Sequence, residues 1–132
     1  MKTIALILTF ILLLAGCGRT SPPEPEPAEI PQHIRITPEQ AREMMAEGAL
    51  ILDVRNPEEF AQGHIENAVL LPLGEIGARA GEIIPDMGQV ILIYCRSGRR
   101  SADAWFALAE LGYVNIYDFG GIIDWPGEIV TS

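Results

Sequence analysis

The chain contains few of the side chains that build disulfides and metal sites. Among its 132 residues there are two cysteines, Cys17 and Cys95, and two histidines, His33 and His64. These scattered residues lack the spacing of a zinc site, so we expect no metal and no cofactor. A dithiol oxidoreductase is also disfavoured, because Cys95 has no resolving cysteine within the chain.

Basic side chains are scarce as well. Nine Lys and Arg residues stand against 18 Asp and Glu residues, which gives a net charge of -9. An acidic surface of this kind argues against nucleic acid and against direct adhesion to anionic lipid. Three of the nine basic residues, Arg96, Arg99 and Arg100, nevertheless follow directly after Cys95. This concentration predicts a local anion site in an otherwise acidic protein.

The apolar run at the N-terminus is too short to span a membrane comfortably. It extends from Ile4 to Ala15 after the basic Lys2, whereas a transmembrane helix needs about 20 apolar residues. We therefore interpret residues 1–16 as a signal peptide. The end of this segment resembles a bacterial lipobox, which implies that Cys17 is lipidated and becomes the first mature residue. The alternative is an ordinary secretory signal in which Cys17 happens to fall near the cleavage site.

The lipobox resemblance also implies a location. Lipid on Cys17 would anchor an exported bacterial lipoprotein to the cell membrane or the outer membrane, facing the periplasm. Gly18, in place of Asp, does not favour retention at an inner membrane. The rest of residues 17–32 is rich in Pro and Glu and has few apolar side chains, so we expect an extended acidic spacer. This spacer would hold residues 33–132 off the membrane.

Residues 33–132 have about the commonest size for one domain and show an alternation of strands and helices. Thr37, Pro38 and Gln40 form the pattern of a capping box, which predicts a helix that ends at Gly48. A second helix start follows at Asn56. Further helices are expected at 75–83 and 101–111, and strands at 33–36, 50–54, 69–71, 90–94 and 115–119. Such an alternation predicts an α/β fold in which helices flank both faces of a central parallel sheet.

Cys95 occupies the place where such a fold puts its ligands. It follows a buried apolar strand and precedes a loop and a helix, so it lies at the carboxyl end of a strand. Free backbone N–H groups and the positive end of the helix dipole favour a thiolate there. Gly98 gives the loop the freedom to adopt an unusual backbone angle. The alternative is that Cys95 is a small buried apolar residue, as free cysteines often are.

Three stretches resemble signatures of one family. Residues 95–101, CRSGRRS, resemble the active-site loop of single-domain rhodaneses, which are sulfurtransferases. Residues 53–65 resemble the upstream signature of that family, and residues 120–125 resemble its closing one. The resemblance implies a rhodanese-like fold and transfer of sulfur from thiosulfate or a persulfide to a thiol or cyanide, through a persulfide on Cys95. The substrate-binding residues would be Arg96, Ser97, Gly98, Arg99, Arg100 and Ser101.

The remaining matched residues are interpreted as structural support for the loop. Charged residues near a strand end would pair with one another and brace it, and two glycines and a tryptophan would pack beneath it. His64 is not favoured as a catalytic base, because the mechanism has no obvious proton to move. The supporting set is Asp53, Arg55, Glu59, His64, Gly120, Gly121 and Trp125.

Two other functions compete with sulfur transfer. Cysteine phosphatases place an arginine six positions after the nucleophile, but here that position is Ser101 and the arginine lies one residue earlier. The shorter loop suits one sulfur atom better than a phosphoryl group, so phosphatase or arsenate reductase activity is disfavoured. The other alternative is a membrane-tethered module of rhodanese type that carries or binds sulfur without turnover.

Overall fold

The structure is a computed structural model that describes residues 16, 18, 21–25, 29 and 31–132. The expected signal peptide, apart from Gly16, and the expected lipidation site at Cys17 lie outside the described residues. So do residues 19–20, 26–28 and 30 of the expected spacer. Among the residues that are described, no helix is long and apolar enough to cross a membrane.

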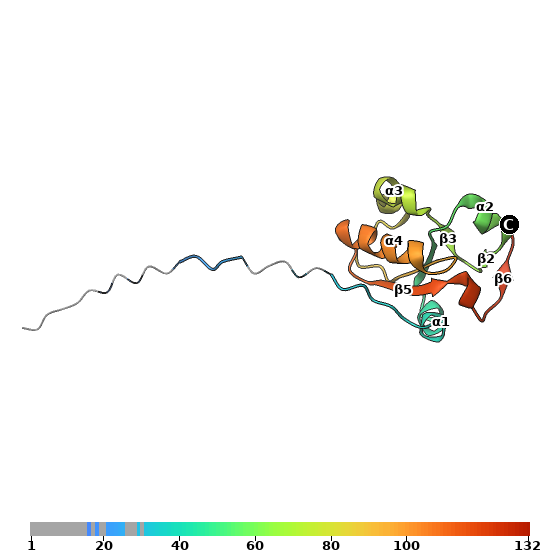
Figure 1. The fold of residues 1–132 in the computed structure, drawn as a ribbon, viewed down its shortest axis with the longest axis horizontal. Coiled ribbons are helices and arrows are strands. Elements are labelled where there is room, and N and C mark those ends of the chain that lie inside the picture. Colours follow the sequence, from blue (N-terminus) through green and yellow to red (C-terminus); the bar gives the residue numbers. More distant parts are fainter. Residues whose placement is uncertain (1–15, 17, 19–20, 26–28, 30) are drawn as a thin grey trace, which may run out of the picture.

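A four-stranded parallel sheet forms the centre of the fold (Figure 1). Its strand order is β3-β1-β4-β5, and each neighbouring pair is parallel. The strands are β1 (Leu50–Asp53), β3 (Val69–Leu70), β4 (Ile91–Cys95) and β5 (Ile116–Gly121). Because β1 and β4 lie between the other two strands, the carboxyl end of β4 lies in the middle of the row formed by the carboxyl ends of the strands.

The apolar run of β4 explains its central place. All five of its residues are buried, as a strand covered on both faces requires. Ile91 and Ile93 belong to one apolar cluster, and Leu92 and Tyr94 belong to the other. Alternate side chains of a strand point to opposite faces, so this single run supplies both cores of the domain.

Helices cover both faces of the sheet. On one face α4 (Arg99–Glu110) packs over β4 and β5 with α3 (Ile76–Ile83) beside it, and α1 (Pro38–Ala46) covers the other face (Figure 1). The short α2 (Pro57–Gln62) connects β1 to the strands that follow it. The architecture confirms the predicted α/β class with its parallel sheet between helical layers.

The predicted helix start at Thr37 is confirmed. The Thr37 hydroxyl accepts from the Gln40 N–H at 3.2 Å, and the Gln40 side chain accepts from the Thr37 N–H at 2.9 Å. These two bonds satisfy backbone donors that the first turn of α1 leaves free. At the start of α2, the Glu59 carboxylate accepts from the Asn56 N–H at 3.0 Å.

Several elements differ from the expectation. Residues 33–36 make a single bridge, Arg35 to Asp118, rather than a full strand. The expected helix at 75–83 is present as α3, and an unexpected 3₁₀ turn, η1 (Leu73–Glu75), precedes it. A small antiparallel sheet of β2 (His64–Ile65) and β6 (Ile129–Val130) was not foreseen, because two-residue strands have no readable alternation.

Candidate active site

The side chain of Cys95 lies at the carboxyl end of β4, beneath the loop that leads into α4. It is 1% exposed, and its Sγ accepts a hydrogen bond from the Gly98 N–H at 3.0 Å. Ser101 Oγ lies 3.7 Å from the same sulfur. Cys95 is therefore buried, as the passive alternative expected, and it also accepts an inward-pointing amide N–H, which stabilises negative charge on sulfur.

Gly98 is the residue that turns the loop into the helix. Its φ of +99° lies in the left-handed region, which side chains of L-residues rarely adopt. With Gly98 as the N-cap, α4 begins at Arg99, two residues before the predicted start. Arg99 and Arg100 thus belong to the first helical turn, and the positive end of the helix dipole lies near Cys95.

The two glycines that end β5 let the loop approach the sheet. A Cβ on Gly121 would collide with the backbone of Arg96 and Ser97, so no larger residue fits there without movement. Ile123 N–H donates to the Arg96 carbonyl at 3.3 Å and fastens the next turn, η2 (Ile122–Asp124), to the same loop. These contacts agree with the packing role that the sequence predicts for Gly120 and Gly121.

Ser101 ties the loop together from below. Its buried hydroxyl donates to the Gly98 carbonyl at 3.1 Å and lies 3.4 Å from the Gly120 carbonyl. The serine thus connects the loop to the end of β5, directly beside the cysteine sulfur. A small hydroxyl residue is needed here because a larger side chain would displace one of these two backbone segments.

The guanidinium of Arg100 is held by a carboxylate from α2. Its Nη1 and Nη2 donate to the two oxygens of Glu59 at 2.7 and 2.8 Å. Hydrogen bonding to Arg100 is the main reason that the pKa of Glu59 is lowered to about 2, and the same bond raises the pKa of Arg100. This bidentate pair braces the first turn of α4 against α2, 41 positions away in the sequence.

A second, buried pair lies behind the first. Arg55 donates to both oxygens of Asp53, with Nη2 to Oδ2 at 2.6 Å, and also to the Gly63 carbonyl at 2.7 Å. Burial alone would lower the pKa of Arg55, but its hydrogen bonds and attraction to Asp53 raise it. Tyr94, beneath the Arg55 guanidinium at 5.6 Å, has a pKa raised mainly by burial. The pair is therefore a fixed part of the framework.

His64 and Trp125 occupy other positions than the charged pairs. The His64 ring stacks on Phe60 at 3.7 Å between centroids, and its Nδ1 lies 2.8 Å from the Phe60 carbonyl oxygen. Within residues 31–132 it forms no ion pair, so it does not join the charged pairing that was expected of it. Trp125 packs on Phe119, and its buried indole N–H has no hydrogen-bond partner in the described part of the chain.

A cavity of about 350 Å³ opens beside the loop. One wall is polar and the other is formed by the apolar side chains of η2. The lining residues are Arg55, Glu59, Gln62, Gly63, Arg96, Ile122 and Ile123. Arg96 and Arg99 are exposed and form no ion pair within residues 31–132, so their charges are available to an anion.

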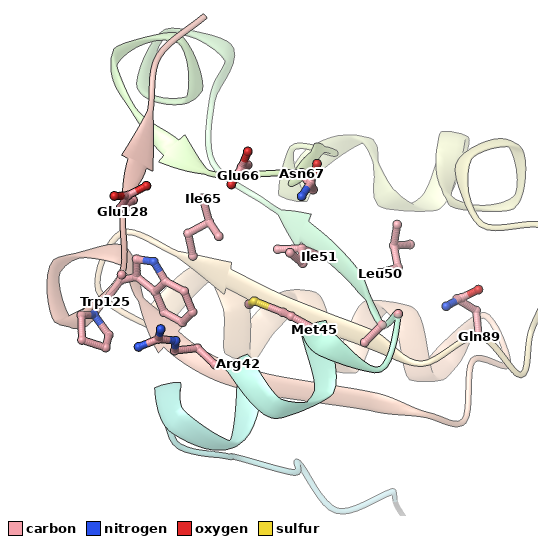
Figure 2. Close-up of a pocket in the computed structure, with 14 residues that line it drawn as sticks. Arg42, Met45, Leu50, Ile51, Ile65, Glu66, Asn67, Gln89, Trp125 and Glu128 are labelled. Carbon is pink, nitrogen blue, oxygen red and sulfur yellow. The ribbon is translucent and has the colours of Figure 1, made fainter.

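A larger cavity, of about 1000 Å³, lies away from the cysteine (Figure 2). Its lining extends along the α1 face of the sheet, from Gln89, just before β4, and Leu50, where β1 begins, to Trp125, beyond the end of β5. Arg42 and Met45 of α1 form one side, and Trp125 lines it as well (Figure 2). Trp125 therefore contributes to this cavity rather than to the lining of the smaller one.

Three residues near the loop were not singled out from the sequence. The Arg35 guanidinium lies against Gly98 and Gly120, and His33 pairs with the buried Asp118. The available signal was weak, because a His and an Arg just before a helix read as the end of a linker. Asp118, an acidic residue within an otherwise apolar strand and two positions before Gly120, was the one hint in the pattern.

Comparison with known proteins gives consistent results. Residues 37–128 match the family model described as rhodanese-like domain. A thiosulfate sulfurtransferase of Escherichia coli is 37% identical over 73 residues, which cover 55% of this chain and 70% of that protein. A sulfurtransferase of Allochromatium vinosum is 44% identical over 80 residues, covering 60% of this chain and 73% of the relative.

A further relative and a solved structure have informative names. A Bacillus subtilis protein named as a putative sulfur carrier is 39% identical over 79 residues, which cover 59% of this chain and 42% of that protein. The solved structure described as rhodanese with anions from E. coli superposes with a TM-score of 0.61 at 33% identity. It covers 64% of this chain and the whole of its own.

Proposed function

The chain belongs to the family of rhodanese-like domains, and on that premise we propose that it is a sulfurtransferase that works through a persulfide on Cys95. The donor is thiosulfate or a persulfide, and the acceptor is a thiol or cyanide. The observation that carries the proposal is the 3.0 Å hydrogen bond from the Gly98 N–H to Cys95 Sγ, made where α4 begins. This contact favours the thiolate that the reaction needs.

In the first step, the Cys95 thiolate attacks the outer sulfur of thiosulfate. A sulfur–sulfur bond forms to Cys95, the sulfur–sulfur bond of thiosulfate breaks, and its electron pair leaves with sulfite. The step needs no proton, which agrees with a site in which His64 is stacked on Phe60. The terminal sulfur of the persulfide keeps the negative charge, and the backbone N–H of the loop and the helix dipole stabilise it.

Two exposed arginines are the best candidates for the sulfonate end of the donor. Arg96 lines the cavity beside the loop, and Arg99 begins α4; both are exposed. Arg100 was expected to share this role, but its two terminal nitrogens are bonded to Glu59. We assign Arg100 to holding the loop, because binding the donor would require it to give up a bidentate ion pair.

In the second step, the acceptor attacks the terminal sulfur of the persulfide. With cyanide, a carbon–sulfur bond forms, the persulfide bond breaks, and thiocyanate leaves while Cys95 regains its thiolate. A thiol acceptor takes the sulfur in the same way, as a thiolate. The cavity between Arg96 and Ile123 gives such an acceptor both a charged and an apolar wall.

We propose the membrane anchorage on the sequence alone. Residues 1–16 would be removed, Cys17 would carry lipid, and residues 17–32 would connect it to the domain at 33–132. The protein would then act at the cell membrane or the outer membrane, facing the periplasm. Growth with a labelled fatty acid tests this: label should appear on the chain and disappear in Cys17→Ser, whereas a labelled Cys17→Ser protein would contradict it.

The activity itself is tested by incubating the full chain with thiosulfate and cyanide and measuring thiocyanate. We expect turnover by the unmodified protein and none by Cys95→Ser. Cys17→Ser is the matched control, since it makes the same change at the other cysteine and should retain turnover. Equal thiocyanate from Cys95→Ser would contradict the proposal.

A sulfur carrier without turnover is the second candidate. It is favoured by the 1% exposure of Cys95, which would protect a bound sulfur, and by the similarity to a protein named as a putative sulfur carrier. A carrier would gain the mass of one sulfur atom on Cys95 after exposure to thiosulfate, yet form no more than one thiocyanate per chain.

A further inference from the structure

Residues 33–36, just before the first helix, lie along the edge strand of the sheet. Asp118 N–H donates to the Ile34 carbonyl at 2.9 Å, and Ile36 N–H donates to the Asp118 carbonyl at 2.9 Å. The segment thus runs parallel to β5, toward the carboxyl ends of the strands, where Cys95 lies (Figure 1). This position puts two of its basic side chains within reach of the active-site loop.

His33 is hydrogen-bonded to a carboxylate that is entirely buried. Its Nε2 lies 2.8 Å from Oδ2 of Asp118, which is 0% exposed. The His33 ring rests on Trp105 and Phe106 of α4, with centroids 5.5 and 5.8 Å apart. Asp118 on β5 is the charged group that faces His33, and α4 presents these two uncharged aromatic rings. A carboxylate buried this deeply requires a partner for its charge.

From Asp118 the contacts lead step by step to the cysteine. Asp118 Oδ1 accepts from the Gly120 N–H at 2.9 Å, and the Gly120 carbonyl lies 3.4 Å from Ser101 Oγ. Ser101 Oγ in turn lies 3.7 Å from Cys95 Sγ. Gly120 has a φ of +91°, so these contacts hold it in an unusual conformation from both of its sides.

Arg35 reaches the same glycines from outside. Its Nη2 lies 3.6 Å from the point where a Cβ of Gly98 would be and 3.7 Å from the corresponding point of Gly120. Within residues 31–132 it forms no ion pair. The guanidinium therefore adds a positive charge beside the backbone that surrounds Cys95.

We propose that His33 is a positioning residue for Cys95 and that residues 33–36 are a working part of the active site. His33 is hydrogen-bonded to Asp118, and Asp118 then holds Gly120 and, through Ser101, the loop around the sulfur. Without His33, the buried carboxylate of Asp118 would lack this partner, which would loosen Gly120 and the loop that favours the Cys95 thiolate. The inference rests on the proposed function, in which this thiolate is the reacting group.

The test is the pH dependence of Cys95 alkylation by iodoacetamide in the full chain. We expect His33→Phe, which keeps an aromatic ring but loses the hydrogen bond to Asp118, to raise the midpoint by about one pH unit. Alkylation near neutral pH would then slow by about tenfold. His33→Gln, which can still donate an N–H to Asp118, should recover most of the rate. Ile116→Val removes one buried methyl from the same strand and should leave the profile unchanged, which separates positioning from a general loss of stability.

A folded His33→Phe protein with the unmodified pH profile would overturn the inference. If that variant does not fold, the titration of the His33 ring by NMR in the unmodified protein and in Cys95→Ser decides the question. Coupling between two sites is reciprocal, so the midpoint of His33 should be lower when the thiolate is absent. Equal midpoints would overturn the proposal. An unmodified protein with an ordinary thiol would instead refute the proposed function, because no reactive thiolate would exist to be positioned.

Discussion

The two cavities of the domain differ in what surrounds them. The cavity on the α1 face of the sheet is about 1000 Å³, and its lining, which includes Arg42, Met45 and Trp125, contains no cysteine (Figure 2). The other cavity is about 350 Å³; Cys95 does not line it either, but the cavity opens beside the loop whose Gly98 N–H donates to the Cys95 sulfur. The smaller cavity is the better candidate for the active site. Hydrogen-bond donors aimed at the reacting atom and nearby charges determine reactivity, whereas the volume of a cavity does not.

The backbone is also held differently at the carboxyl ends and at the amino ends of the strands. At the carboxyl ends, Arg100 is bonded to Glu59, and Arg55 is bonded to Asp53. Gly121 lies too close to the active-site loop to allow a side chain. At the amino ends, Gly48 also has a positive φ, of +94°, but a Cβ there would meet nothing within 4 Å. The carboxyl ends of the strands are thus fixed by contacts from several elements, whereas the backbone at Gly48 has open space around it.

Replacing the cysteine, and separately one residue of the larger cavity, should give the largest difference in reaction rate. Cys95→Ser should lower thiocyanate formation by about a thousandfold or more, because serine cannot form a persulfide. Gln89→Ala, in the lining of the larger cavity, should leave the rate within about twofold. A steady-state assay with thiosulfate and cyanide measures both. A comparable loss in Gln89→Ala would show that the larger cavity takes part in the reaction.

Replacing Gly98 and Gly48, which both have a positive φ, with alanine should separate an effect on activity from an effect on stability. Gly98→Ala and Gly48→Ala both force a side chain into a positive φ, so each should cost about 1–2 kcal/mol of unfolding free energy. Only Gly98→Ala should also lower kcat, by about tenfold to a hundredfold, because it displaces the N–H that donates to Cys95. Urea unfolding and kinetics together check this; equal kcat in the two variants would argue against a role for that amide.

Neutralising one arginine at each cavity should give a smaller effect. Arg96→Gln should raise KM for thiosulfate by about tenfold with little change in kcat, since a charged contact to the donor is lost. Arg42→Gln removes the same charge from the lining of the larger cavity and should leave KM within about twofold. If both variants raise KM equally, the arginines act through overall charge rather than through a site.

The smallest effect concerns the ion pair between α2 and the loop. The pKa of Glu59 is lowered from about 4.5 to about 2, so its pair with Arg100 stabilises the fold above about pH 4.5. This contribution is lost as the pH falls from about 4.5 toward 2. Glu59→Gln should therefore be less stable by about 1 kcal/mol at neutral pH and equal to the unmodified chain near pH 2. Urea unfolding across this range tests it, and a constant difference at every pH would contradict it.

The sequence predicts best those features that depend on neighbouring residues. The buried run 90–94 marks the central strand, and Thr37, Pro38 and Gln40 mark the start of α1, because capping bonds join residues three apart. The position of Cys95 at a strand end follows from the same local pattern. For these features no knowledge of tertiary contacts is required.

Features that depend on distant contacts could not be predicted. The partner of Arg100 is Glu59, 41 positions away, and nothing in the loop itself shows that its arginine is already bonded. His33 and Asp118 are 85 positions apart, so the role of residues 33–36 emerges only when the sheet is formed. The early start of α4 was also missed, because Gly98, with no side chain to cap the helix, is its N-cap.

The central claim is that Cys95 carries the sulfur as a persulfide. The most direct measurement is mass analysis of the full chain after exposure to thiosulfate, with sulfite measured in the same sample. We expect one added sulfur atom on the peptide that contains Cys95, one sulfite released per chain, and loss of the added mass on treatment with cyanide. Thiocyanate formation with no sulfur added to Cys95, or with the sulfur on another residue, would contradict it.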